Sequence, residues 1–286
     1  MRYRCHAKVN MTLSILGRRG DGYHTIRSIF QAVALHDDLA VERSSSGIGL
    51  EVRSPFPGIP SSGENLVIRA VREVMAHRGV SCGLEMVLTK RIPPGAGLGG
   101  GSSDAFAAIR ALDGLLSLEL TEDEYLEIAA RIGSDVPYFY YGGTAMVTGR
   151  GEHVTPLADF SDREAVIVMP PRAISSKDAY RWWDERSGSS HQALQDARSC
   201  ATLPDEASLV IGNDFEEVIF SRYHEIAHIK EKLLALGCEA ASLTGSGSAV
   251  VGYHREKGRL RDFAGAFSGE CLVIPTTTLR RSQCMT

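Results

Sequence analysis

The sequence predicts an α+β protein of two domains, residues 1–158 and 159–286, with the boundary in a loop near 157–162. Two patterns support this fold class. In the first half, a short strand, a glycine-rich loop and an apolar helix follow one another. In the second half, the expected elements run strand, helix, strand, strand, helix, strand, which is the order of a ferredoxin-like unit. A chain of 286 residues is also long enough to bury two hydrophobic cores.

The first strand is predicted by alternation between residues 8 and 15, where apolar side chains hold the odd positions and polar ones the even positions. Lys8 and Asn10 therefore share one face. For a strand taken alone, a solvent-exposed polar face is the ordinary interpretation. Alternation does not decide between that interpretation and a functional one.

A turn-rich segment at 17–22 separates this strand from a second one, which begins at Tyr23 and His24 and extends to about residue 35. The pair Asp37-Asp38 is interpreted as a break that ends this strand before the next one. Thr121 and Glu124 have the spacing of a capping box. The other elements expected in the first domain are strands at 39–42, 48–52 and 84–89 and helices after Asn65, from about Ser102 and from Thr121 to Ile132.

The most informative stretch is 93–104, in which five of twelve residues are glycine and two prolines stand at the start. Apolar residues recur at helical spacing directly after it, at 106, 109, 112 and 116. Glycine lets backbone N–H groups approach an anion closely, and a helix N-terminus adds partial positive charge. The expected ligand is therefore a phosphate group.

Three interpretations of this loop compete, besides a turn without a ligand. Gly95, Gly97 and Gly100 satisfy the dinucleotide fingerprint G-x-G-x-x-G, but the next acidic residues open a helix rather than follow a second strand. The P-loop spacing nearly fits, yet Gly101 stands where that motif needs its lysine. A phosphate-binding loop of another family remains. A turn without a ligand is disfavoured, because glycine costs about 0.5–1 kcal/mol in regular structure.

Asp135 stands between Gly133, where the third helix is expected to end, and an aromatic run at 138–141. A carboxylate in this position could cap a helix, which is the ordinary interpretation. It could also be a base in a partly desolvated site. Spacing alone does not decide.

The second domain contains the ferredoxin-like pattern. Residues 186–205 are polar and carry no assignment, and a tight glycine loop, Thr244 to Ser248, joins the two central strands. A break near Ser221 is allowed for in the longest helix. The elements expected are strands at 165–169, 239–243, 249–253 and 271–275 and helices at 175–183, 215–236 and 260–267.

Composition excludes several classes of function. The net charge is −4, and no basic run is interleaved with aromatic residues, so no nucleic-acid partner is expected. No apolar run approaches the length of a membrane span, and the N-terminus turns polar too early for a signal peptide. The six cysteines form no C-x-x-C pair, which indicates reduced thiols rather than a metal site. The expected location is the cytoplasm, without a membrane partner.

Three blocks of the sequence resemble the GHMP kinase superfamily, which includes homoserine, mevalonate and galactose kinases. They are Ala7-Lys8-Val9-Asn10 on the first strand, the stretch from Pro93 to Ser103, and Leu243 to Ala249. The middle block is the most specific, and the resemblance is weakest from 184 to 210. It implies a two-domain GHMP kinase fold, with an S5-domain-2-like N-terminal domain, a ferredoxin-like C-terminal domain and the active site between them.

Four further segments narrow the resemblance to one branch of the superfamily, which phosphorylates the 2-hydroxyl of a cytidyl diphosphate alcohol in the non-mevalonate route to isoprenoid precursors. These segments are Gly22-Tyr23-His24, Gly97-Leu98-Gly99-Gly100-Gly101-Ser102-Ser103, Gly133-Ser134-Asp135-Val136-Pro137 and Gly142-Gly143-Thr144-Ala145. Another GHMP small-molecule kinase, such as mevalonate or homoserine kinase, is the alternative of the same class. A nucleotide-binding regulator without catalysis is the alternative from a different class.

The resemblance also implies site residues. Lys8 and Asp135 would face each other at the acceptor hydroxyl as the catalytic pair, with Asp135 as the base and Lys8 keeping it ionised. The ATP-binding set would be Asn65, Pro93, Pro94, Gly95, Ala96, Gly97, Leu98, Gly99, Gly100, Gly101, Ser102 and Ser103. The substrate-binding set would be Asn10, Tyr23, His24, Tyr180, Gly245, Ser246 and Gly247.

The cofactors implied are ATP and Mg²⁺, which would arrive with the nucleotide; the sequence identifies no protein ligand for the metal. The partners implied are ATP and a small cytidyl substrate. The chain is expected to act as a monomer or a weak homodimer.

Overall fold

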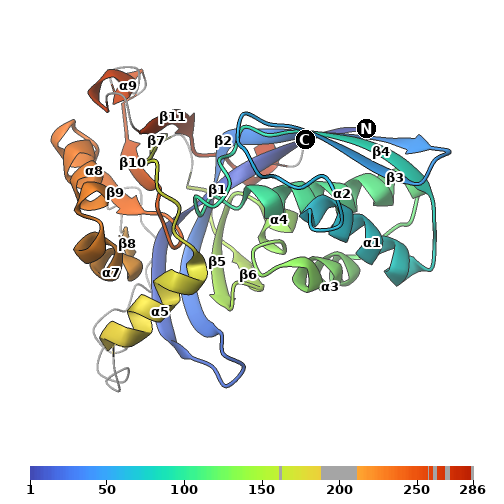
Figure 1. The fold of residues 1–286 in the computed structure, drawn as a ribbon, viewed down its shortest axis with the longest axis horizontal. Coiled ribbons are helices and arrows are strands. Elements are labelled where there is room, and N and C mark those ends of the chain that lie inside the picture. Colours follow the sequence, from blue (N-terminus) through green and yellow to red (C-terminus); the bar gives the residue numbers. More distant parts are fainter. Residues whose placement is uncertain (161–162, 188–210, 257, 260–262, 268–270, 285–286) are drawn as a thin grey trace.

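The computed structural model describes residues 1–160, 163–187, 211–256, 258–259, 263–267 and 271–284, and it contains two β-sheets with helices packed on them (Figure 1). The larger sheet contains β1 (Arg2–Arg18), β2 (His24–Ser44), β3 (Ile48–Arg53), β4 (Gly83–Thr89), β5 (Thr144–Gly149), β6 (His153–Pro156) and β8 (Gly212–Asn213). Its main order is β3-β4-β2-β1-β8, and β5 pairs with β2 and carries β6. β1 and β2 form a long antiparallel hairpin. Hairpin residues between Lys8 and Phe30 line the candidate site described below.

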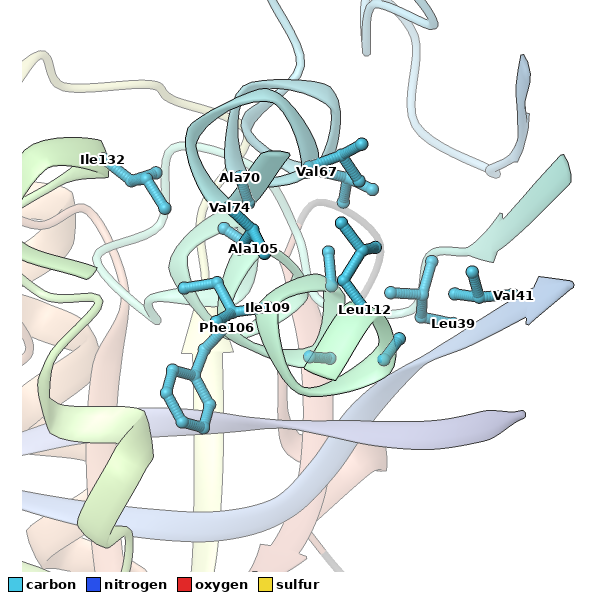
Figure 2. Close-up of a cluster of buried hydrophobic side chains, with 14 of the residues drawn as sticks. Leu39, Val41, Val67, Ala70, Val74, Ala105, Phe106, Ile109, Leu112 and Ile132 are labelled. Atoms are coloured by element: carbon cyan, nitrogen blue, oxygen red, sulfur yellow. The ribbon is translucent and has the colours of Figure 1, made fainter. Parts of the chain in front are cut away.

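Three helices cover one face of the larger sheet. They are α1 (Leu66–Arg78), α2 (Gly100–Leu116) and α3 (Glu122–Ile132). Figure 2 shows their apolar side chains meeting those of β2, such as Leu39 and Val41, in one buried cluster. The predicted starts of α1 and α3 are confirmed, because Asn65 caps α1 and Thr121 forms a capping box with Glu124 at α3.

The predicted break at Asp37-Asp38 is wrong, because β2 continues through both residues. Asp37 is fully buried, and its carboxylate accepts hydrogen bonds from the Lys90 ammonium and from the backbone N–H groups of Arg91 and Ile92. A buried carboxylate is tolerated when it is paired and hydrogen-bonded in this way. The sequence pattern contains no sign of partners so far away along the chain.

The polar face of β1 is not exposed to solvent, so the ordinary interpretation of Lys8 and Asn10 is wrong. Both residues are buried. The apolar face of the strand, including Val9 and Met11, packs against residues of the smaller sheet. The other face is covered by the glycine-rich loop, and an added Cβ on Gly99 would lie 2.9 Å from the Lys8 side chain.

The second half confirms the ferredoxin-like prediction. Its sheet contains β7 (Glu164–Met169), β9 (Ala240–Leu243), β10 (Val250–His254) and β11 (Leu272–Thr277). The strand order is β11-β7-β10-β9 and all three pairings are antiparallel. The helices described there are α5 (Ser176–Ser187), α7 (Phe215–Arg222), α8 (His224–Ala235) and α9 (Phe263–Ala266). Tyr223 separates α7 from α8, close to the expected break, and positions 260–262 of the last predicted helix lie outside the described residues.

The two halves of the chain are joined at several points. β8 pairs with β1 in parallel, and Asn213 lies beside Leu13. The C-terminal segment returns to the larger sheet, where the Leu279 N–H donates to the Ala32 carbonyl over 2.9 Å. It ends in α10 (Arg281–Cys284). Among the described residues, no helix has both the length and the apolar character needed to cross a membrane. The domain boundary near residue 158 stays a prediction.

Candidate active site

Two cavities meet at the glycine-rich loop. The larger, of about 870 Å³, lies between the β1–β2 hairpin, the turn around Asp135 and helix α5, and we call it the large cavity. The smaller, of about 360 Å³, surrounds residues 93–102, and we call it the loop cavity. Gly97 and Ser102 line both cavities. A ligand in the loop cavity that extends past these two residues would reach the large cavity.

The backbone of the loop adopts a conformation that requires glycine. Gly95, Gly97 and Gly99 have φ values of +69°, +75° and +70°, a region that other residues rarely adopt. Gly99 is also the N-cap of α2, and no side chain caps this end of the helix. The N-terminal N–H groups of a helix of 17 residues therefore face the loop without a side-chain partner, which favours an anion there.

The predicted catalytic pair is brought together. Nζ of Lys8 lies 3.3 Å from Oδ2 of Asp135, and the side chain of Lys8 is only 4% exposed whereas that of Asp135 is 33% exposed. The same ammonium donates to Oδ1 of Asn10 over 2.8 Å and lies 4.2 Å from the centre of the Phe30 ring. Asp135 does not cap the short helix α4 (Tyr138–Tyr141), which starts after Pro137 without a side-chain cap. Its carboxylate therefore faces Lys8 at the large cavity.

Asn10 connects Lys8 to the second half of the chain. Its backbone N–H donates to Oγ1 of Thr244 over 3.0 Å, and its Nδ2 donates to Oγ of Ser28 over 2.8 Å. The second glycine loop begins beside Thr244. A Cβ on Gly245 would lie 3.1 Å from Cα of Gly97, so the two glycine loops touch through their backbones. Absence of side chains at both positions is what allows this contact.

The loop cavity contains nearly all of the predicted ATP-binding residues. Residues 93–102 and Asn65 line it, whereas Ser103 is buried on another side of α2, in a small hollow beside Phe106. Both polar groups of Asn65 are already bonded, since its Oδ1 accepts from the Val67 N–H and its Nδ2 donates to the Pro60 carbonyl. Its contact with adenosine stays a prediction.

The predicted substrate-binding residues line the large cavity, except Gly247, which faces Leu243 and Ile174 instead. His24 is buried, and its ring stacks on Tyr180 with the centroids 4.4 Å apart and the planes inclined by 13°. Tyr23 is 55% exposed, and its ring lies 4.9 Å from the guanidinium of Arg150. One face of Tyr180 is thus covered by His24, and Tyr23 stands apart from both.

Sequence reasoning missed several residues of the large cavity: Arg18, Ser134, Arg150, Ser176, Lys177, Arg181, Asp184 and Glu185. Ser176 lies at the start of α5, and its hydroxyl is 2.8 Å from that of the predicted Ser246. Arg150 follows Gly149, whose φ of +73° marks the turn between β5 and β6. The turn dipeptide Gly149-Arg150 was the available signal, but neither strand was predicted.

A buried ionic cluster of Asp37, Lys90 and Asp104 flanks the glycine-rich loop. Nζ of Lys90 bonds to Asp37 and lies 2.6 Å from Oδ2 of Asp104, while Oδ1 of Asp104 is buried without a hydrogen-bond partner. Lys90 precedes the loop and Asp104 lies in the first turns of α2. Burial raises the pKa of Asp104 to about 7; the adjacent Lys90 opposes this and Asp37 reinforces it. The cluster therefore joins both ends of the loop to β2.

This cluster predicts a pH dependence of stability. Between its ordinary pKa of 3.8 and about 7, Asp104 holds a proton in the folded protein that the unfolded chain releases. Stability from this group is therefore complete below about pH 4 and is lost as pH rises through about 7. Replacing Asp104 with Asn should remove the part of the fall in melting temperature between about pH 5 and pH 8 that this group causes, measured by calorimetry. Asp38→Asn changes a half-exposed neighbour in β2, whose side chain is 43% exposed, and should leave that fall as in the wild type. An Asp104→Asn variant with the wild-type slope would contradict the assignment.

No cluster of three His, Cys, Asp or Glu side chains suited to a metal ion is present among residues 1–160, 163–187 and the other described parts of the chain. Ser102 lines both cavities and supplies a hydroxyl oxygen where they meet. Such a site suits a hard cation that takes most of its ligands from phosphate and water.

Comparison with known proteins agrees with this architecture. The sequence profile described as "GHMP kinases N terminal domain" matches residues 65–143, and the profile described as "GHMP kinases C terminal" matches residues 192–271. A protein of Symbiobacterium thermophilum named 4-diphosphocytidyl-2-C-methyl-D-erythritol kinase is 38% identical over 282 residues, which cover 96% of this chain and 99% of that protein. A protein of the same name from Moorella thermoacetica is 40% identical over 252 residues, covering 86% and 87% of the two chains.

Solved structures show the same similarity. A crystal structure described as 4-(cytidine 5'-diphospho)-2C-methyl-D-erythritol kinase superposes with a TM-score of 0.79 at 32% identity, covering 97% of this chain and 99% of that one. Homoserine kinase from Cytophaga hutchinsonii superposes with a TM-score of 0.71 at 18% identity, covering 96% of each chain, which shows a shared fold only.

Proposed function

The chain belongs to the 4-diphosphocytidyl-2-C-methyl-D-erythritol kinases, a family of GHMP kinases, and we propose that it transfers the γ-phosphoryl group of ATP to the 2-hydroxyl of 4-diphosphocytidyl-2-C-methyl-D-erythritol. The observation that carries the proposal is the Lys8–Asp135 ion pair beside Gly97 and Ser102, the residues common to both cavities. ATP in the loop cavity and the acceptor in the large cavity would meet at this pair.

Phosphoryl transfer needs positioning and charge stabilisation more than covalent chemistry from the protein. The backbone N–H groups of the loop and of the α2 N-terminus would hold the ATP phosphates, since no side chain competes for them. Asp135 is exposed enough to accept the proton of the attacking hydroxyl. Lys8, held by Asn10 and by the Phe30 ring, would orient that carboxylate and offset negative charge on the transferring group.

Mg²⁺ belongs to this proposal as the partner of the nucleotide. Ser102, which lines both cavities, is the side chain that would contact it, alongside phosphate oxygens and water. When bound, the ion would neutralise phosphate charge in the loop cavity.

The charge of the large cavity suits the acceptor. Five cationic side chains line it, namely Lys8, Arg18, Arg150, Lys177 and Arg181, against three anionic ones, namely Asp135, Asp184 and Glu185. Lys177 lies at the N-terminal end of α5, where the helix dipole adds further positive potential. A diphosphate linkage between two neutral groups would be attracted by this surplus.

The cytosine would be read by His24 and stacked against Tyr180, with Tyr23 as the other candidate ring. Replacing Tyr180 or His24 with Ala should each raise KM for the cytidyl acceptor by about tenfold, because stacking on an aromatic ring is worth about 1–3 kcal/mol. ATP affinity should stay constant, since neither residue lines the loop cavity.

A truncated acceptor provides the control for this prediction. An acceptor without the cytidine half should be a poor substrate for the wild type and no worse for the two variants. Equal losses on full and truncated acceptors would mean that these residues support the fold instead of reading the base.

The test of the function itself is direct. Purified protein should consume ATP with the cytidyl acceptor, and turnover on mevalonate or homoserine should be lower by orders of magnitude. Comparable turnover on either of those two acceptors would overturn the substrate assignment, and no ATP consumption with any acceptor would favour a regulator without catalysis. A cytoplasmic monomer or weak homodimer, with domains at 1–158 and 159–286, completes the proposal.

A further inference from the structure

We propose that Asp184 is a positioning residue that determines specificity for the base, by fixing which nitrogen of His24 carries the proton. This inference rests on the proposed function, in that the acceptor carries a cytosine. The carboxylate lies on α5, and its Oδ1 is 2.7 Å from Nε2 of His24 at the start of β2. The contact joins residues 160 positions apart in the sequence, across the large cavity that both of them line.

Aromatic neighbours hold the His24 ring in place. The role of the Asp184 carboxylate is therefore to determine which ring nitrogen carries the proton, rather than where the ring lies. Tyr180 stacks on one face of the ring, and Trp183 meets it edge-on with the centroids 5.8 Å apart and the planes inclined by 87°. The side chain of His24 is 4% exposed and that of Asp184 is 26% exposed. Nearby, Nη1 of Arg18 lies 3.8 Å from the other oxygen of Asp184, which leaves Oδ1 for the histidine.

An ionised carboxylate can only accept hydrogen bonds, so the nitrogen facing it must carry a proton. In a neutral imidazole this places the proton on Nε2 and leaves Nδ1 with a free lone pair. Among the described residues, Nδ1 has no hydrogen-bond partner. His24 lines the large cavity, so in this tautomer it has an acceptor nitrogen for a ligand, on a ring held by two aromatic side chains.

An acceptor at this position distinguishes cytosine from uracil. Cytosine presents an amino donor at position 4, where uracil, like thymine, presents a carbonyl acceptor. The amino group would complete the hydrogen bond to Nδ1, whereas the carbonyl would meet a lone pair and leave both acceptors unpaired. Sites that hydrogen-bond a substrate group discriminate strongly against an analogue that cannot reproduce the bond.

The experiment compares kcat/KM for the cytidyl acceptor and its uridyl counterpart in the wild type, in Asp184→Ala and in Asp184→Asn. We expect the wild type to prefer the cytidyl acceptor by about 10²-fold or more. The Ala variant should lose about tenfold of this preference. The Asn variant should retain most of it, because its Oδ1 still accepts from Nε2 although the charge is lost.

Two controls separate positioning from folding. Glu217 also contacts α5, through an ion pair with Arg186, but it does not line the large cavity. Glu217→Ala should therefore leave the cytidyl preference unchanged. Melting temperatures of all variants should show that they are folded. In addition, ¹⁵N NMR of the wild type, with the His24 signals identified by their loss in His24→Gln, should show the proton on Nε2. In Asp184→Ala the two tautomers should be mixed.

The outcomes are distinct. A wild-type preference for the uridyl acceptor, an Ala variant with the full cytidyl preference, or a His24 ring protonated on Nδ1 alone would each overturn the inference. A wild type that phosphorylates neither acceptor would instead overturn the proposed function, and the NMR measurement would still decide the role of Asp184.

Discussion

Turnover of the Asp135→Asn variant should fall by about 10²–10⁴, the usual contribution of a general base. The amide keeps the shape of the side chain but cannot take the proton of the attacking hydroxyl. Affinity for ATP should change little, because Asp135 does not line the loop cavity. Steady-state kinetics with the cytidyl acceptor and calorimetric titration with ATP would measure the two effects separately.

The partner of Asp135 gives a second measurement of the same unit. Lys8→Met removes the ammonium that contacts Asp135 at 3.3 Å and Asn10 at 2.8 Å, so turnover should fall here as well. The double variant should lose less than the product of the two single losses, because residues that act as a unit are not additive.

Two results would count against this pairing. One is a double variant whose losses multiply, which would mean that Lys8 and Asp135 act separately. The other is a comparable loss in Asp123→Asn, the same chemical change at an exposed position of α3 in the same half of the protein.

Replacing Gly97 with Val should abolish ATP binding. The sequence predicts one cause, a side chain in the space of the phosphates, with the fold left intact. The structure adds two further causes: φ at this residue is +75°, and a Cβ would lie 2.6 Å from the carbonyl oxygen of Thr244. The glycine-rich loop would have to move away from the second glycine loop. Its phosphate-binding conformation and the contact between the two halves of the chain should therefore be lost together.

The matched control is Gly47→Val. Gly47 has a φ of +56° in the turn between β2 and β3, and a Cβ there would meet no atom within 4 Å. The Gly47→Val variant therefore has the backbone strain of a side chain at positive φ, about 1–2 kcal/mol, but no steric clash. Calorimetry should show ATP binding near the wild-type level for this variant and none for Gly97→Val. Normal ATP binding by Gly97→Val would mean that the phosphates lie elsewhere.

Local patterns were enough to predict most of the elements. The helix that follows Asn65, the cap at Thr121, the glycine loop leading into α2 and the four strands of the smaller sheet all depend on residues close together in the sequence. The same holds for the residue types at the loop, because positive φ and close backbone approach both require glycine. For such features the interacting atoms are neighbours along the chain, so their pattern is visible without a structure.

The features that failed depend on partners far away in sequence. β2 does not stop at Asp37, because Lys90 and the following backbone N–H groups neutralise a carboxylate that alone would favour a turn. The polar face of β1 is a second case, because Lys8 and Asn10 are buried against partners such as Asp135 and Thr244, which lie more than 100 residues further along the chain.

The pairing of Lys8 with Asp135 was implied by family resemblance, but only the tertiary structure brings their side chains within 3.3 Å. No sequence pattern pointed to Asp184, because its proposed role depends on a hydrogen bond to His24, which lies 160 residues earlier. The sequence by itself determined the fold class and the phosphate loop, which follow from short-range backbone preferences. The tertiary structure decided which charged and polar groups face one another, because burial and pairing of such groups depend on distance in space.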